Sequence, residues 1–153
     1  MKILISAGPT REKIDPVRYI SNRSSGKMGY AIAQAALKMG HSVTLVSGPV
    51  NLTPPENVRV FNVISAAEMA DVIHRQAVDA DVVIMAAAVA DYRPVNPFDN
   101  KMKKLPGNLS LQLERTEDIL ATLGKNKRPG QILVGFAAET DDLLKNAQGK
   151  LER

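Results

Sequence analysis

The stretch Asp81–Ala87, DVVIMAA, decides the fold. It is apolar at nearly every position, which is typical of a central strand in a parallel sheet, where both faces are buried. Outward from it, β-branched runs predict strands over residues 2–6, 41–47, 58–63 and 131–137, with an alternating strand nearer a sheet edge over 109–113. Helices are predicted over residues 26–39 and 66–77, through Leu123 after a cap at Thr116, and over 141–153. This alternation predicts an α/β fold, a Rossmann-like doubly wound, mostly parallel sheet with helices on both faces.

The helix predicted over 26–39 has an apolar stripe at helical spacing, which we expect to face the core. The stripe consists of Met28, Ala31, Ile32, Ala35 and Met39. Ser24 or Ser25 can cap the start of this helix, and Lys38 and Gly40 mark its end. The next helix is predicted to begin with a capping box, because Ser65 is followed three residues later by Glu68.

Length and composition limit the function classes. The chain has 153 residues, 44% of them hydrophobic, with 20 Lys and Arg against 16 Asp and Glu and no cysteine. This predicts one domain with no disulfide, zinc ribbon or cysteine nucleophile. The longest apolar run, Val82–Ala90, is too short for a transmembrane helix of about 20 residues, so we expect a cytoplasmic protein without a membrane partner. His41 and His74 lie in no metal-binding motif, so we expect no metal site made by the protein alone.

The first candidate site segment follows the first strand. It comprises Ser6–Arg11, SAGPTR, and Tyr19–Gly29, YISNRSSGKMG. Ser24, Ser25 and Gly26 stand where a helix begins, and unpaired N–H groups there predict a phosphate site. Arg23 and Lys27 add positive charge, and Asn22 offers an amide. The alternative is that Gly26 and Gly29 serve only helix packing. The segment is not a GxGxxG fingerprint, and Ser47 stands where an NAD-binding acid would end the second strand.

Three further segments follow later strands: Ala86–Pro94 (AAAVADYRP), Lys101–Lys104 (KMKK) and Val134–Thr140 (VGFAAET). Asp91 could hold a ribose or base edge, orient a lysine or bind Mg²⁺ through water, or else cap a strand or pair with Arg93. Three lysines in four residues are usually a solvated face. Their place shortly after Asp91 favours a triphosphate contact. Phe136 could stack on a base, although a core position is the safer interpretation.

These four segments, in this order, resemble the phosphopantothenate–cysteine ligases of coenzyme A biosynthesis, of the bacterial CTP-dependent type. The resemblance covers nearly the whole chain and implies a single nucleotide-binding ligase domain over residues 1–153, stopping before the last unit of the fold. It implies that CTP, with Mg²⁺, activates the carboxylate of 4'-phosphopantothenate as an acyl-cytidylate. The amine of L-cysteine then displaces CMP. A homodimer with an interface near Leu109–Leu113 is implied, as is a flavin decarboxylase domain in the full-length protein.

The resemblance also assigns roles to residues. Lys101 should neutralise the triphosphate, and Asn22 should hold the acyl intermediate. Asp91 and Phe136 should contact the ribose and base, and Lys150 stands where the family has a nucleotide-binding lysine. The main chain of two short segments should complete the nucleotide pocket, namely Met85, Ala86 and Ala87 together with Glu117, Asp118, Ile119 and Leu120.

Two other function classes are weighed against this one. An NAD(P)-dependent reductase on the same fold needs a lysine four residues after a tyrosine, but Arg23, Gln34 and Asn96 follow the three tyrosines at that spacing. A nucleic-acid-binding module built on Lys101–Lys104 would have few stacking platforms, since only 4% of residues are aromatic. We therefore expect no nucleic-acid partner.

Overall fold

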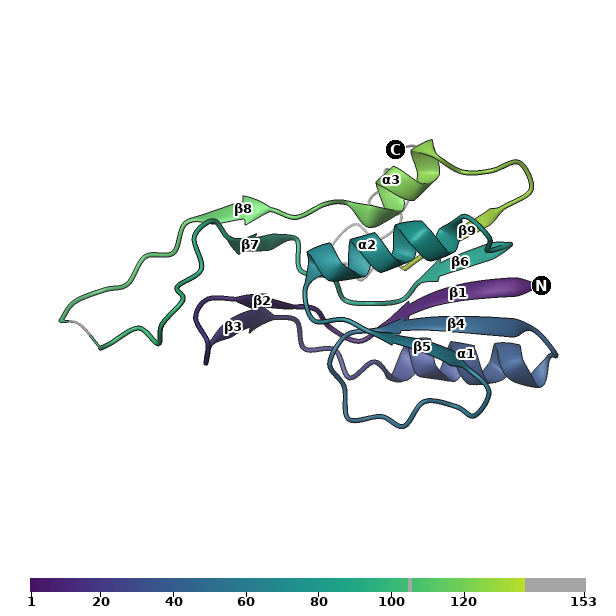
Figure 1. The fold of residues 1–153 in the computed structure, drawn as a ribbon, viewed down its shortest axis with the longest axis horizontal. Helices are drawn as coiled ribbons and strands as arrows, with labels where there is room; N and C mark the ends of the chain where they lie inside the picture. Colours follow the sequence, from purple (N-terminus) through teal and green to yellow (C-terminus); the bar gives the residue numbers. More distant parts are fainter. Residues whose placement is uncertain (105, 137–153) are drawn as a thin grey trace.

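A five-stranded parallel sheet forms the centre of the computed structural model, which describes residues 1–104 and 106–136. Its strands are β1 (Lys2–Ala7), β4 (Ser42–Ser47), β5 (Arg59–Asn62), β6 (Val82–Met85) and β9 (Ile132–Gly135). Their order in space is β5-β4-β1-β6-β9 (Figure 1). The chain moves outward from β1 in one direction through β4 and β5, then crosses back to β6 and β9. The carboxyl end of β1 is therefore a topological switch point, where sheets of this kind bind ligands.

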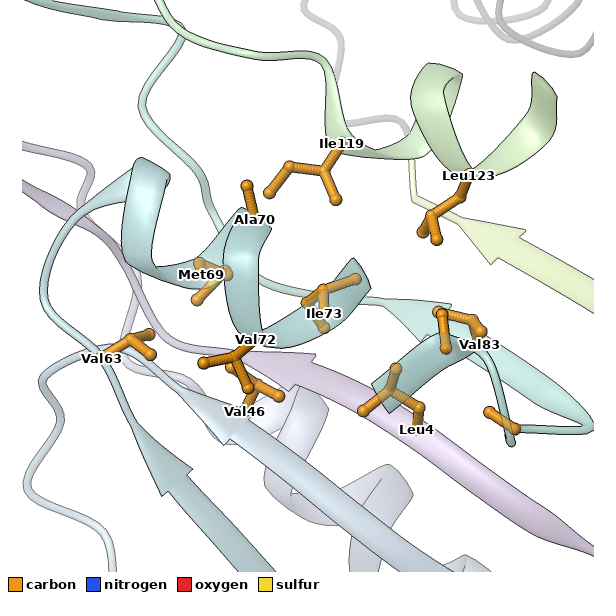
Figure 2. Packing of buried hydrophobic residues seen from close by; sticks show 12 residues of the cluster. Leu4, Val46, Val63, Met69, Ala70, Val72, Ile73, Val83, Ile119 and Leu123 are labelled. Carbon is orange, nitrogen blue, oxygen red and sulfur yellow. The ribbon is translucent and has the colours of Figure 1, made fainter. Parts of the chain in front are cut away.

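Helices cover both faces of the sheet, as predicted. Helix α1 (Lys27–Lys38) lies on one face, and α2 (Ala66–Ala77) and α3 (Ile119–Lys125) lie on the other (Figure 1). Side chains of β1 alternate between the two resulting cores: Ile3 and Ile5 pack with α1, whereas Leu4 packs with α2 and α3. Figure 2 shows the second core, in which side chains of both helices converge on the sheet. The Rossmann-like, doubly wound fold class is thus confirmed.

The predicted buried face of α1 is wrong at four of its five positions. Met28 and Met39 are 55% and 72% exposed, while the buried positions are Gly29, Tyr30, Ala33 and Ala36. A Cβ at Gly29 would lie 2.5 Å from the Cβ of Ala7 and 2.9 Å from the Ser6 carbonyl oxygen. The helix therefore approaches β1 through its small residues. Met28 and Met39 of the stripe are displaced toward solvent, whereas Ile32 is partly buried against this core.

Helix ends match the predictions in part. The prediction of Ser24 or Ser25 as the cap of α1 is wrong: the N-cap is Gly26, with φ 76°, and no side chain caps the helix. Gly40 does end it, in a left-handed conformation with φ 79°. The capping box of α2 is confirmed, because Ser65 Oγ accepts a hydrogen bond from Glu68 N at 3.2 Å. The Glu68 carboxylate accepts from Ile64 N at 2.8 Å.

Two small antiparallel hairpins lie outside the main sheet, and neither was predicted. One pairs β2 (Arg11–Lys13) with β3 (Tyr19–Ser21), and the other pairs β7 (Tyr92–Pro94) with β8 (Leu113–Arg115). The strand predicted over 109–113 is wrong, since only Leu113 lies in a strand and its partner is β7. Three-residue strands with mostly exposed side chains carry too little hydrophobic periodicity to be recognised.

The start of α3 also differs from the prediction. Thr116 does not cap this helix; its hydroxyl donates to the carbonyl of Ala90. Asp118 is the N-cap and accepts a hydrogen bond from Ala121 N at 2.9 Å. The helix predicted over 141–153 lies outside the described residues. Within the described part of the chain, no helix is long and apolar enough to cross a bilayer.

Candidate functional site at the carboxyl edge of the sheet

Three loops meet at the switch point so closely that only glycine fits. A Cβ on Gly48 would lie 1.9 Å from the carbonyl oxygen of Pro9, and one on Gly26 would lie 2.8 Å from Val50 Cγ1. Gly8 and Gly26 both have positive φ angles, of 74° and 76°. Packing therefore accounts for Gly26 and Gly29. This close approach of the loops places the uncapped start of α1 beside the cleft described below.

Buried side chains of the β1 strand and its loop hold the segment that follows β6. Ser6 Oγ accepts a hydrogen bond from Ala87 N at 3.1 Å, and Thr10 Oγ1 accepts one from Ala90 N at 2.9 Å. Both side chains are fully buried. The main chain adds a bond from Ala88 N to the Gly8 carbonyl at 2.9 Å. The small-residue segment 86–90 of AAAVADYRP, called the wall below, is thus fixed in place. The N–H groups of Ala87, Ala88 and Ala90 are hydrogen-bonded to β1 and the loop that follows it.

Asn22 is fixed against that wall. Its Nδ2 donates to the carbonyl oxygens of Ala88 and Val89, each at 3.2 Å. Two acceptors on the nitrogen set the orientation of the amide, so Oδ1 is left as an acceptor for a ligand. Asn22 also lines a cleft of about 480 Å³.

The cleft gathers several predicted residues and two cations. Its lining includes Asn22, Ser24 and Ser25, with Arg11 and Lys27 beside them. Sequence reasoning assigned no role to Arg11, whose guanidinium lies 4.6 Å from the ring centroid of Tyr19. The signal that could have found it is a cation placed directly after the first strand's Gly-Pro turn. Two cations next to an uncapped helix start make this cleft suitable for an anion.

The residues predicted for a nucleotide converge beside the cleft, at the carboxyl ends of β6 and β9. Met85 pairs in register with Gly135, and the position of a Gly135 Cβ is only 2.5 Å from Leu120 Cδ2. The Asp91 carbonyl accepts a hydrogen bond from Thr116 N at 2.9 Å, which brings Asp91 next to the segment 117–120. The structure therefore brings together Met85, Ala86, Ala87, Asp91, Glu117, Asp118, Ile119 and Leu120, with Phe136 at the end of β9.

Side chains in this group differ in availability. Phe136 is 48% exposed, so it is not the core residue that its position suggested, whereas Ile119 is buried in the core. Asp118 is occupied as the cap of α3. Arg93 pairs with Glu114 at 2.8 Å, so the structure does not support the alternative that Asp91 pairs with Arg93.

Glu117 faces a second cleft, of about 350 Å³, which lies between α2 and the β7–β8 hairpin. His74 Nε2 lies 2.7 Å from Glu117 Oε1. Burial raises the pKa of Glu117, but hydrogen bonds from Thr122 and His74 outweigh burial and hold this pKa below its usual value. The Glu117 carboxylate therefore has structural partners of its own.

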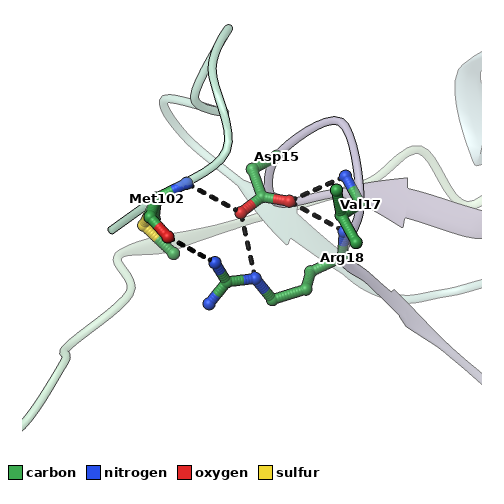
Figure 3. A network of polar contacts seen from close by, with 4 residues as sticks. All are labelled: Asp15, Val17, Arg18 and Met102. Atoms are coloured by element: carbon green, nitrogen blue, oxygen red, sulfur yellow. Dashed lines mark hydrogen bonds and ion pairs between the residues drawn. The ribbon is translucent and has the colours of Figure 1, made fainter. Parts of the chain in front are cut away.

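Lys101 is exposed and does not lie in the cleft with Asn22. The next residue, Met102, is bound to Asp15 and Arg18 at the turn of the β2–β3 hairpin (Figure 3). Asn22 follows Arg18 by four residues, with β3 between them. At ~3.3 Å per residue of extended chain, Asn22 is therefore separated from Arg18 by up to roughly 13 Å. Lys150 lies outside the described residues. Within residues 1–104 and 106–136, no three His, Asp or Glu side chains gather as a metal site would require.

The family described as DNA/pantothenate metabolism flavoprotein C-terminal domain matches residues 1–153. The chain belongs to this family. The resemblance drawn from the four motifs is thereby confirmed at the level of the family.

Individual curated proteins are also similar to this chain. The Vibrio vulnificus coenzyme A biosynthesis bifunctional protein CoaBC is 52% identical over 153 residues, which are 99% of this chain and 38% of that protein. A protein of an unknown prokaryotic organism, named cysteine/cysteine sulfinic acid decarboxylase, is also 52% identical over 99% of this chain and 43% of its own length. The chain thus spans about two fifths of these curated relatives.

Among solved structures, the crystal structure of the C-terminal domain of CoaBC superposes with a TM-score of 0.86 at 50% identity, covering 99% of this chain and 71% of that one. At this identity, both the order of the strands and the loops at the carboxyl edge are expected to be shared.

Proposed function

We propose that this domain ligates 4'-phosphopantothenate to L-cysteine with CTP, through an acyl-cytidylate. Family membership and the CoaBC relatives support a role in coenzyme A biosynthesis. The observation that carries the proposal is the cationic cleft at the switch point, where Asn22 is held against the braced segment 86–90. A site that offers cations and a fixed amide, rather than a nucleophile and base, suits the joining of two anions.

In the first step, a carboxylate oxygen of phosphopantothenate attacks the α-phosphorus of CTP. The bond between that phosphorus and the bridging oxygen breaks, and pyrophosphate leaves. Such transfers depend on positioning and on charge neutralisation. Arg11 and Lys27 in the cleft, together with Lys101, would offset the repulsion between the two anions. Mg²⁺ would be bound mainly by the phosphates of CTP, as this ion commonly is.

CTP would lie at the ends of β6 and β9. Phe136 offers an exposed ring for the base, and Asp91 offers a carboxylate for the ribose. The main chain of 85–87 and 117–120 would line the pocket, and the same proposal keeps Lys150 as a nucleotide contact.

In the second step, the amine nitrogen of cysteine attacks the acyl carbon, the carbon–oxygen bond to the cytidylate breaks, and CMP leaves. The nitrogen loses a proton to solvent as the amide forms. The amide of Asn22 would hold the acyl-cytidylate, because Oδ1 can accept a hydrogen bond from the incoming amine while Nδ2 remains bound to the wall.

Calorimetry tests the nucleotide. With Mg²⁺ present, CTP is expected to bind tightly enough to be distinguished from ATP, and equal weak affinity for both would contradict the proposal. A companion assay omits cysteine: pyrophosphate release that requires both CTP and phosphopantothenate is the signature of the first step. We expect that release in the natural full-length protein.

Lys101→Gln is expected to lower the rate of acyl-cytidylate formation more than tenfold, equal to about 1.4 kcal/mol of barrier. The reason is that the neutral amide no longer offsets the triphosphate charge. Rapid-quench measurement of the pyrophosphate burst checks this, with Lys38→Gln, at the far end of α1, as a control of equal charge change. A burst that is unchanged by Lys101→Gln would refute the role.

The same proposal includes a homodimer and, in the full-length protein, a separate flavin decarboxylase domain. The decarboxylase name of one relative would then belong to a part of that protein that this chain does not cover. Because phosphorylated reactants do not cross membranes unaided, the ligation would take place in the cytoplasm.

A further inference from the structure

We infer that Asp15 positions Lys101 for the first half of the ligation, by binding the segment 98–102 to the turn of the β2–β3 hairpin. The inference rests on the proposed function, and it assigns Asp15 a positioning role with no contact to substrate. Asp15 lies in none of the motifs that identified the family.

The two carboxylate oxygens of Asp15 have separate tasks (Figure 3). Oδ1 accepts hydrogen bonds from the N–H groups of Val17 and Arg18, both at 2.8 Å, and so builds the turn. Oδ2 accepts a hydrogen bond from Met102 N at 3.2 Å and forms an ion pair with Arg18, whose Nε lies 3.0 Å away. The Asp15 residue is only 2% exposed. A buried carboxylate with three N–H donors and an arginine as its ion-pair partner is a strong and directional anchor.

The bound segment is held on both sides of Lys101. Met102 is tied at its N–H by Asp15 and at its carbonyl by Arg18 Nη2, the latter at 2.8 Å. On the other side, Phe98 N donates to the carbonyl of Ile14 at 2.8 Å. The main chain of Lys101 is therefore fixed, although the Lys101 side chain is exposed. By contrast, the Asp99 side chain on the same segment is 99% exposed, and its contact with Lys13 Nζ is long, at 4.0 Å.

A fixed main chain matters because a lysine side chain is long and flexible. Its ammonium neutralises a triphosphate only within a short range, and each extra degree of freedom lowers the fraction of time it spends there. Misplacement of a catalytic group by ~1 Å can cost on the order of 100-fold in rate. Release of the segment should therefore weaken the step in which Lys101 acts and spare the step in which it does not.

Asp15→Asn separates the two tasks of the carboxylate. The amide oxygen can keep the turn at the Oδ1 position, while an NH₂ group at the Oδ2 position would face the N–H of Met102 and the guanidinium of Arg18. We expect a pyrophosphate burst at least about tenfold slower than wild type. The rate at which cysteine consumes preformed acyl-cytidylate should stay unchanged. The matched control is Asp99→Asn, which removes the same charge from the same segment and should leave both rates as they are.

A double-mutant cycle distinguishes positioning from general damage. If Asp15 acts through Lys101, Asp15→Asn has little further effect, below about twofold, in the Lys101→Gln background. An equal loss in both backgrounds, or no loss in the wild-type background, overturns the positioning role while the proposed function stands. A wild-type protein that releases no pyrophosphate from CTP and phosphopantothenate overturns the proposed function and this inference with it.

Hydrogen exchange of the Met102 amide in the wild-type protein gives an answer that does not depend on a variant. Protection from exchange is expected from the bond to the buried carboxylate. Exchange at the rate of an unstructured peptide would overturn the anchor.

Discussion

The amide of Asn22 makes its contacts through a single orientation, with Nδ2 against the Ala88 and Val89 carbonyls. Asn22→Asp would set a carboxylate oxygen against those carbonyls, and the repulsion should turn the side chain away from the wall. We expect the second step to slow at least tenfold, about 1.4 kcal/mol. Acyl-cytidylate should therefore accumulate in rapid-quench samples. Asn108→Asp, on an exposed loop, supplies the control. A product rate equal to wild type in Asn22→Asp would argue against the assignment.

The charge of Asp15 predicts that the stability of the fold depends on pH. Burial alone would raise its pKa, but hydrogen bonds from Val17, Arg18 and Met102 and the Arg18 charge bring the pKa below its ordinary 3.8. A depressed pKa stabilises the fold above the unfolded value, and that contribution is lost as pH falls through the folded value. Asp15→Asn should thus have a lower Tm than wild type at pH 7, and the difference should shrink below pH 3.8.

Thermal melts at both ends of that range measure the difference. Asp99→Asn, whose side chain is 99% exposed, should match wild type at every pH. A Tm difference between wild type and Asp15→Asn that stays constant from pH 7 to strongly acidic pH would show that the Asp15 charge is not responsible.

Among elements, the close contact of α1 with β1 rests on Gly29. Alanine normally stabilises a helix over glycine by up to ~1 kcal/mol. At Gly29, however, the added Cβ would lie 2.5 Å from Ala7 Cβ, and Gly29→Ala should instead destabilise the fold by roughly 1–3 kcal/mol. Gly124→Ala in α3 is the matched control, since a Cβ there meets nothing within 4 Å. Urea unfolding compares them, and stabilisation by both substitutions would contradict the packing.

On the scale of the whole molecule, the β7–β8 hairpin and the loop between its strands extend beyond the main sheet (Figure 1). This arm exposes Tyr92, Phe98, Leu109 and Leu113, each by more than 40%. Exposed apolar side chains along a projecting arm favour an interface. We expect sedimentation equilibrium to find a homodimer, and the double variant Leu109→Asp with Leu113→Asp to shift it toward monomer. Val78→Asp, at the C-cap of α2, should not shift it, and a monomeric wild type would refute the homodimer.

Much of the fold could be predicted because hydrophobic periodicity is a local property. The run at Asp81–Ala87 identified a central strand, and the Ser65 and Glu68 pair marked a helix start. The buried face of α1 could not be predicted, because it depends on how closely Gly29 approaches Ala7 across the sheet. The candidate site divides in the same way: the motifs named Asn22, Asp91 and Phe136, but nothing in them singled out Arg11.

By itself, the sequence determined the alternation of strands and helices and the family, because both are written in spacing and in short motifs. Only the tertiary structure decided which side chains meet. Asp15 and Met102 are 87 residues apart, and their bond exists because a hairpin and a loop fold onto each other outside the sheet. Contacts of this kind depend on the path of the whole chain, and no local pattern of residues encodes that path.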